Sequence, residues 1–210
     1  KDGRWVPGRT LRASDFAGQL NHENNTDWKP VVFDEVSQQV VVPNGTIGAR
    51  WGDQGKWNLQ EKNQHDDSDI TPMLSFLDHS DEVLPVAFPY FANKQHAQAI
   101  FAHSDHDSIL NRKVPVKTLQ LAEGTVKAVT VHDLMLANYG LDRGMDDDQV
   151  AKSYDDDIPY TPAWQEKISG VKREQIIQVA REFADTADKT HGRSMVILGA
   201  AINHWYHMDM

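Results

Sequence analysis

Residues 171–200 read VKREQIIQVAREFADTADKTHGRSMVILGA, and this stretch decides the fold that we expect. Apolar side chains recur in it at helical spacing, with charged residues between them: Ile176, Ala180, Phe183 and Ala187, flanked by Ile177 and Ala184. The pattern predicts an amphipathic helix that turns Phe183 inward and ends at Gly192. The apolar run that follows, at 193–200, is typical of a short buried strand.

A second helix is predicted just before this stretch. Thr161 and Pro162 are followed by AWQEKI, which places the proline in the first turn of a short helix. The order helix, helix, strand and glycine-containing turn is half of a wound α/β unit. We therefore expect an α/β fold, with a Rossmann-like wound half in the C-terminal part, 113–210, and a β-rich, loop-rich lobe in 1–112.

Turn residues divide the rest of the chain into short elements. KPVVFDEVSQQVVVP predicts two strands, near 30–33 and 38–42, and VPVKTLQL and VKAVTV predict two more around Glu123 and Gly124. VHDLMLANYG predicts a helix that Gly140 ends. Residues 62–112 are polar and rich in His and Asp, and the prolines of VLPVAFPYF exclude a helix there. We expect this region to be the least regular and most mobile part.

Composition excludes several classes of function. The chain has 210 residues, of which 40% are hydrophobic, so it can bury a core. Its formal net charge of −10 argues against a general nucleic-acid or anionic-membrane surface. It contains no cysteine, so no disulfide, thiol nucleophile or thiolate metal site can come from it. No apolar stretch approaches the roughly 18 residues of a membrane span.

Polar side chains gather after the predicted strand, where α/β sheets bind ligands. Gly199 permits a tight turn and a close backbone approach to a phosphate or another flat or anionic ligand. Asn203 can both donate and accept hydrogen bonds, and protonated His204 and His207 can donate to an anionic ligand. Alternatively, these side chains only pack and satisfy local hydrogen bonds beside Trp205 and Tyr206.

Other polar clusters point to surface rather than to a site. A metal site is conceivable in the cluster His103, Asp105, His106 and Asp107, but its spacing matches no tight zinc pattern, and a solvated loop is the better interpretation. The acidic runs 146–148 and 155–157 lack the glycine hinge of a calcium loop, and they predict turns or helix starts. We expect Arg50, Trp51 and Trp57 to hold a loop against the core or against parts outside this chain.

The chain also resembles a known family along its length. TPAWQEKISGVKREQIIQVAREFAD is similar to a segment of the molybdopterin-dependent oxidoreductases. ADKTHGRSMVILGAAINHWYHMDM resembles one branch, the catalytic alpha subunits of membrane-bound respiratory nitrate reductases. GRTLRASDF, VVPNGTIGARWG, GKWNL, LANYGLDRG and SYDDD followed by YTPAW resemble the same subunits. The resemblance implies an internal piece of a longer subunit.

The resemblance implies the chemistry of the whole subunit. Such subunits hold molybdenum between two molybdopterin guanine dinucleotides, together with an iron–sulfur cluster. They reduce nitrate to nitrite at the cytoplasmic side of the inner membrane, with electrons from quinol that arrive through a haem-bearing gamma subunit and an iron–sulfur beta subunit.

The resemblance also limits what this segment itself does. The family's metal ligands lie upstream, so it implies a cofactor cradle and pocket wall here, with Gly199, Asn203, His204 and His207 as candidates. It implies no catalytic residue and no metal ligand, and a soluble segment that binds no cofactor by itself and is inactive alone. The alternative is a stand-alone acidic α/β domain that binds or supports other molecules without catalysis.

Overall fold

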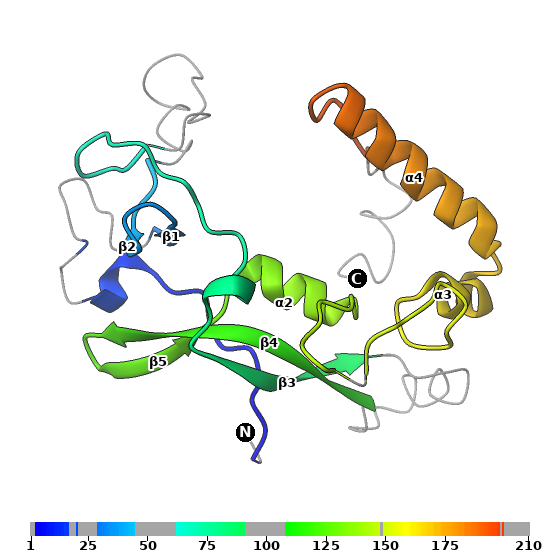
Figure 1. Cartoon of the computed structure of the whole chain (residues 1–210), viewed down its shortest axis with the longest axis horizontal. Coiled ribbons are helices and arrows are strands. Elements are labelled where there is room, and N and C mark those ends of the chain that lie inside the picture. The colour runs from blue at the N-terminus through cyan, green and yellow to red at the C-terminus, as the bar shows by residue number, and fades with distance from the viewer. Residues whose placement is uncertain are drawn as a thin grey trace. The chain divides into compact units, whose positions relative to one another are not determined.

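The computed structural model describes residues 3–16, 20, 29–44, 62–90, 108–147, 149–197 and 199. The chain divides into two compact units, Lys1–Ala151 and Lys152–Met210, and each is treated by itself below. Both helices and strands are present, so the predicted α/β class is confirmed at this level (Figure 1). Among the described residues, no helix is long and apolar enough to cross a membrane.

A three-stranded antiparallel sheet organises the first unit. It consists of β3 (Glu82–Tyr90), β4 (Ser108–Leu121) and β5 (Gly124–Ala128), in the order β3-β4-β5. The long strand β4 pairs with β3 through its first half and with β5 through its second half. The predicted turn at Glu123 and Gly124 is confirmed, because β5 starts at Gly124 and pairs it with Leu121.

Prolines in the sheet stand where they remove no ladder hydrogen bond. The Ala87 N–H points out of the edge of β3 and donates to the Trp5 carbonyl at 2.9 Å. Pro85 and Pro89 lie two residues to either side of Ala87, so by alternation they face the same edge. A proline at a ladder position would have broken the pairing with β4. These prolines exclude a helix, as predicted, and at this register they permit a strand.

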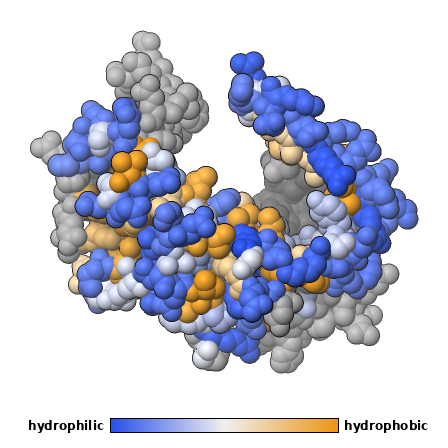
Figure 2. All heavy atoms as spheres, viewed as in Figure 1, coloured by the Kyte–Doolittle hydropathy of each residue, from blue (hydrophilic) through white to orange (hydrophobic). Residues whose placement is uncertain are grey.

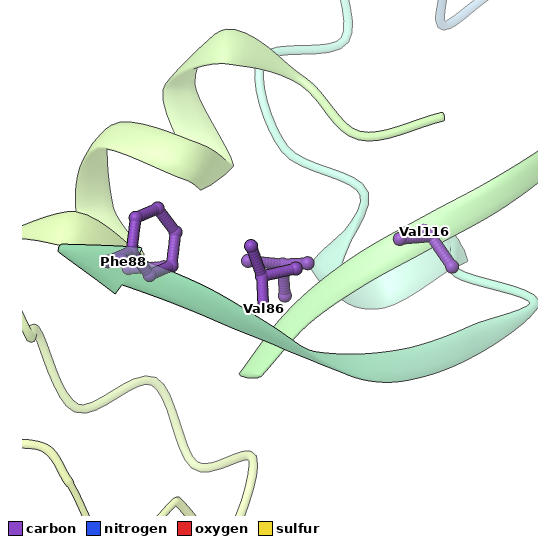
Figure 3. Packing of buried hydrophobic residues seen from close by; sticks show 5 residues of the cluster. Val86, Phe88 and Val116 are labelled. Atoms are coloured by element: carbon purple, nitrogen blue, oxygen red, sulfur yellow. The ribbon is translucent and has the colours of Figure 1, made fainter. Parts of the chain in front are cut away.

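The core of the first unit lies between the sheet and one helix, α2 (Val131–Asn138). Alternate residues of β3 and β4 face this helix and are buried beneath it: Val86, Phe88, Val114 and Val116, with Ala137 from α2 (Figure 3). Burial of each larger side chain contributes roughly 1.5–3 kcal/mol. Thr130 caps α2, since its Oγ1 accepts a hydrogen bond from the Asp133 N–H at 2.9 Å.

A two-stranded hairpin adds a smaller layer to the first unit. Strands β1 (Val32–Asp34) and β2 (Gln39–Val41) pair antiparallel, as the sequence predicted. A short 3-10 helix, η1 (Ala13–Phe16), precedes them, and a second, η4 (Leu77–His79), follows.

Burial works against the charged form of Asp34, but hydrogen bonds from Ser37, Thr71 and Val36 outweigh it, so its pKa is lowered.

The C-terminus of α2 depends on one glycine and one buried arginine. Gly140 has φ +72°, its N–H donates to the Ala137 carbonyl, and the Leu141 N–H donates to the Leu136 carbonyl. This double pattern closes a helix in a Schellman motif. Arg112 is fully buried and donates to the carbonyls of Ala137 and Asn138, at the negative end of the helix dipole.

The second unit contains the two helices that the sequence predicted near its end. Helix α3 (Pro162–Ser169) has Pro162 in its first turn and Thr161 as its cap, whose Oγ1 accepts from the Trp164 N–H at 3.1 Å. Helix α4 (Arg173–Lys189) is longer, at 17 residues, and ends where the Gly192 N–H donates to the Ala187 carbonyl at 2.7 Å. The two helices contact each other.

Two sequence predictions about the second unit are wrong for this chain. Residues 193–197 form no strand, and three consecutive side chains there, Met195, Val196 and Ile197, are 79%, 69% and 82% exposed. Phe183, which we expected to face inward, is 43% exposed. The physical reason is the same in both cases: a strand requires neighbouring strands to pair with, and none of the described residues of this unit forms one.

The prediction for residues 62–112 is also wrong in part. Residues 82–90 are strand β3, and 108–112 begin the central strand of the sheet. The expected boundary at 112/113 therefore falls inside β4, whereas the compact units meet at Ala151 and Lys152. Short apolar runs between prolines carry no helical or strand periodicity, so the sequence did not show that this region supplies Val86 and Phe88 to the core.

Two glycines of the loop after α2 provide a matched test of the helix end. Gly140 and Gly144 have φ values of +72° and +75°, but a Cβ at Gly140 would lie 2.6 Å from the Arg112 guanidinium, while one at Gly144 would meet nothing within 4 Å. Gly144→Ala is expected to cost about 1–2 kcal/mol of unfolding free energy for the left-handed backbone alone. Gly140→Ala should cost clearly more, because the buried guanidinium must also move. Urea unfolding of both variants measures the difference, and equal losses would contradict this packing.

Candidate functional site

The predicted site begins where α4 ends. Ser194 Oγ donates to the Phe183 carbonyl at 3.2 Å, and the Arg193 N–H donates to Thr190 Oγ1 at 3.1 Å, so the chain turns back against the helix. Gly199 is exposed, and an added Cβ there would meet no atom within 4 Å. The other candidates, Asn203, His204 and His207, lie outside the described residues, and their role stays a prediction.

An apolar surface runs along α4 and into the segment after it. Val179 is 65% exposed and Phe183 43%, and Met195, Val196 and Ile197 are more exposed still. We call these five residues the apolar surface of the second unit. In Figure 2, α4 is hydrophilic along one side and paler, more apolar, along the other. Monomeric domains seldom expose so many neighbouring large apolar side chains without a partner for them.

Charged side chains fix the junction between α3 and α4. Arg173 Nε donates to Glu166 Oε2 at 2.7 Å, and its Nη1 donates to Asp155 Oδ1 at 2.7 Å. The hydrogen bond from Arg173 lowers the pKa of Glu166, with a smaller contribution from Lys172. The same two carboxylates, Glu166 first, raise the pKa of Arg173. Glu166 and Arg173 therefore both stay charged at neutral pH, and their ion pair holds the two helices together.

The two acidic runs are structural turns. Asp156 accepts the N–H groups of Lys152 and Ser153, and Asp157 pairs with Lys167. In the other run, Asp147 accepts the N–H groups of Lys113 and Gln149. The described part of the chain holds no group of three or more His, Cys, Asp or Glu residues that could bind a metal ion. The described residues of both runs therefore lie in turns and loops, as predicted, while Asp148 lies outside the described residues.

The remaining predicted clusters cannot be placed. His103, Asp105, His106 and Asp107 lie outside the described residues, as do Arg50, Trp51 and Trp57. A shallow groove of about 410 Å³ does lie within the described part. Among the described residues, its lining comes from α4 alone: Glu174, Ile177, Gln178, Arg181, Glu182 and Asp185. Polar groups on one helix face do not converge on a ligand from several sides, as a small-molecule site requires.

A buried polar cluster in the first unit escaped the sequence analysis. Asp133 is fully buried in α2, and its carboxylate accepts hydrogen bonds from Ser75 Oγ at 2.7 Å and the Phe76 N–H at 2.9 Å. Arg143, from the loop after α2, forms an ion pair with the same carboxylate, and only 9% of the arginine side chain is exposed. Asp133 thus ties three segments together. Its position inside VHDLMLANYG carried no signal, because acidic residues are common in the first turn of any helix.

Comparison with known proteins identifies the family of the chain. No family model matches it. It is 51% identical over 211 residues to the respiratory nitrate reductase 1 alpha chain of Escherichia coli (strain K12), an alignment that covers all of this chain. It is 42% identical over 209 residues to the nitrate reductase alpha chain of Bacillus subtilis (strain 168), again over all of this chain. It is 37% identical over 215 residues to the nitrate reductase alpha subunit of Mycobacterium tuberculosis (strain ATCC 25618 / H37Rv), covering 98% of this chain.

The chain belongs to the nitrate reductase alpha chain family.

The chain spans only about one sixth of the length of these nitrate reductase alpha chains, with coverages of 17%, 16% and 16%. Because the alignments cover 98–100% of this chain, the predicted resemblance to nitrate reductase alpha subunits is confirmed along its whole length. Similarity at this level extends through both compact units, so neither unit is foreign to the family.

The buried ion pair of the first unit gives a direct test of its packing. Asp133→Asn is expected to lower the unfolding free energy by about 3 kcal/mol, because it leaves the buried Arg143 charge without a counter-ion. Nε and Nη2 of Arg143 have no other partner among the described residues, so nothing compensates. Asp69→Asn is the control, since that aspartate lies in the same unit, its side chain is 82% exposed, and the loss of its ion pair with Lys62 should change stability little. Similar effects of the two variants in urea unfolding would refute the role of Asp133.

Proposed function

We propose that this chain is part of the catalytic alpha subunit of a molybdenum-dependent respiratory nitrate reductase, where it contributes cofactor cradle and pocket wall. The observation that carries the proposal is the 51% identity to the respiratory nitrate reductase 1 alpha chain along the whole length of the chain. The reaction is the reduction of nitrate to nitrite. The electrons come from quinol through a haem-bearing gamma subunit and an iron–sulfur beta subunit, at the cytoplasmic side of the inner membrane.

In that subunit the second unit is part of a Rossmann-like wound domain. In this unit, helix α4 is followed by three consecutive apolar residues at 195–197. This supports the proposal, because the strands of a parallel sheet are buried on both faces and therefore consist of consecutive apolar residues. Neighbouring strands from elsewhere in the subunit would complete the sheet. The exposed apolar surface of the second unit supports the same proposal, and a stand-alone acidic domain gives no reason for it.

The residues of this chain suit a position beside the cofactor and not a role as metal ligands. The chain has no cysteine to bind an iron–sulfur cluster, and its described residues offer no metal-binding group of three. Gly199, by contrast, leaves its backbone open to the approach of a flat ligand. Gly199, Asn203, His204 and His207 would hold a pterin edge, for which amide and imidazole groups are suitable donors and acceptors.

In this proposal the cofactor supplies the redox chemistry, and residues of this chain hold and orient it. When bound, molybdenum between two molybdopterin guanine dinucleotides supplies the two-electron reduction of nitrate. The task of His204 would be to donate a hydrogen bond toward the cofactor or toward negative charge that develops on an oxyanion. The task of Asn203 would be to orient the pterin by accepting and donating at its edge.

The chain by itself is expected to be inactive. With reduced viologen and nitrate, the purified 210-residue chain should give no turnover, because it lacks cluster ligands and the family's metal ligand lies outside it. The full-length subunit from the same coding sequence, assayed in parallel, should reduce nitrate. Turnover by the 210-residue chain, or none by a full-length subunit that is loaded with molybdenum, would contradict the proposal.

His204→Ala in the full-length subunit tests the cradle. Removal of one well-placed donor is expected to lower nitrate turnover on the order of 10²-fold. A cradle role also predicts lower molybdenum content, which elemental analysis measures independently of activity. His79→Ala is the matched control, because that histidine is exposed in η4 of the first unit. Wild-type turnover and wild-type molybdenum content in the His204→Ala enzyme would reduce His204 to a packing residue.

A further inference from the structure

Helix α4 and the segment after it expose apolar side chains that have no cover among the described residues. Val179 and Phe183 lie four residues apart on α4, and are therefore on one face of it. Met195, Val196 and Ile197 follow the end of the helix and are each more than two-thirds exposed. The hydrogen bond from Ser194 Oγ to the Phe183 carbonyl keeps the start of this segment against α4.

The backbone of this segment has no pairing among the described residues. Residues 195–197 make no hydrogen bond to any other described residue. Three consecutive apolar residues in an extended segment present apolar groups to both faces, since successive side chains alternate. A strand of that kind is stable only with a neighbouring strand at its edges and an apolar layer on each face.

One layer is already available. Helix α4 is 17 residues long, or about 25 Å at 1.5 Å per residue, enough to cover a strand of about 17–20 Å. What this unit lacks among its described residues is the paired strands. The similar alpha chains are about six times as long as this chain, so most of their sequence lies outside it.

We infer that the apolar surface of the second unit is a docking surface for strands of the remainder of the alpha chain. These strands pair with both edges of the strand formed by 195–197, and their apolar side chains cover α4. The inference rests on the proposed function, and it names the occupant as the same subunit and not the beta or gamma subunit. Residues 195–197 become a strand only when that remainder is present.

Hydroxyl-radical footprinting of two methionines tests the inference. Met195 is 79% exposed and Met73 is 8% exposed, a ratio of about ten. In the 210-residue chain, Met195 should be oxidised far faster than Met73. In the full-length alpha subunit without beta and gamma subunits, its oxidation should slow about tenfold, to the rate of Met73. Denatured protein provides the upper reference for both residues.

Each other outcome overturns the inference. Unchanged oxidation of Met195 in the full-length alpha subunit would show that the surface stays open, and protection only after beta or gamma is added would assign it to another subunit. Protection already present in the 210-residue chain would place the cover within this chain, or in a second copy if dilution removed it. Nitrate turnover of the same full-length preparation is measured separately. An active enzyme in which Met195 stays exposed would refute the inference and leave the proposed function standing.

A pair of variants on α4 supplies the control. Val179→Asp places a charge on the docking face, whereas Gln178→Asp places one on the other side of the helix. Val179→Asp should leave the melting temperature of the 210-residue chain nearly unchanged, since Val179 is 65% exposed there. Gln178→Asp should lower it slightly, since it loses the hydrogen bond to Glu182 and places two like charges four residues apart. In the full-length subunit, Val179→Asp should abolish the protection of Met195 and Gln178→Asp should not. Equal behaviour of the two full-length variants would refute the docking surface.

Discussion

Apolar side chains must leave water, and in the second unit the described residues leave several of them unburied. The face of α4 that carries Val179 and Phe183, and the run Met195–Ile197, are the clearest case. At about 25 cal/mol for each Å² of apolar area, their burial would contribute substantially to folding, and here that contribution is not realised. In the proposed alpha subunit, the remainder of a much longer chain would cover this surface.

The first unit buries its apolar core between its own sheet and helix α2. Alternate residues of β3 and β4 meet one face of α2, and two buried charged residues hold that helix at both ends. Asp133 binds the segment before η4 and the loop after α2, and Arg112 binds the last carbonyls of the helix. Both side chains are fully buried, so their hydrogen bonds are costly to lose. The two units thus differ in kind: one closes a core, and the other presents a surface.

Local signals in the sequence predicted local structure well. The helix start at Pro162, the turn at Gly124 and the helix end at Gly140 were all predicted, because each depends on residues close in sequence. Strand β3 was missed, since the partner that makes VLPVAFPY a strand lies beyond residue 107. The expected strand at 193–200 was wrong in this chain for the converse reason: its partners are not among the described residues. Of the candidate site, only Gly199 could be compared with the structure, and the family assignment came from long matches and not from any single residue.

The central claim is that the second unit is incomplete without the rest of an alpha subunit. Amide hydrogen exchange at residues 195–197 tests it most directly, because strand pairing would protect the backbone groups that have no hydrogen bond to another described residue. We expect slow exchange in the full-length, nitrate-reducing subunit and near-random-coil exchange in the 210-residue chain. Equally fast exchange of these amides in both proteins would contradict the claim.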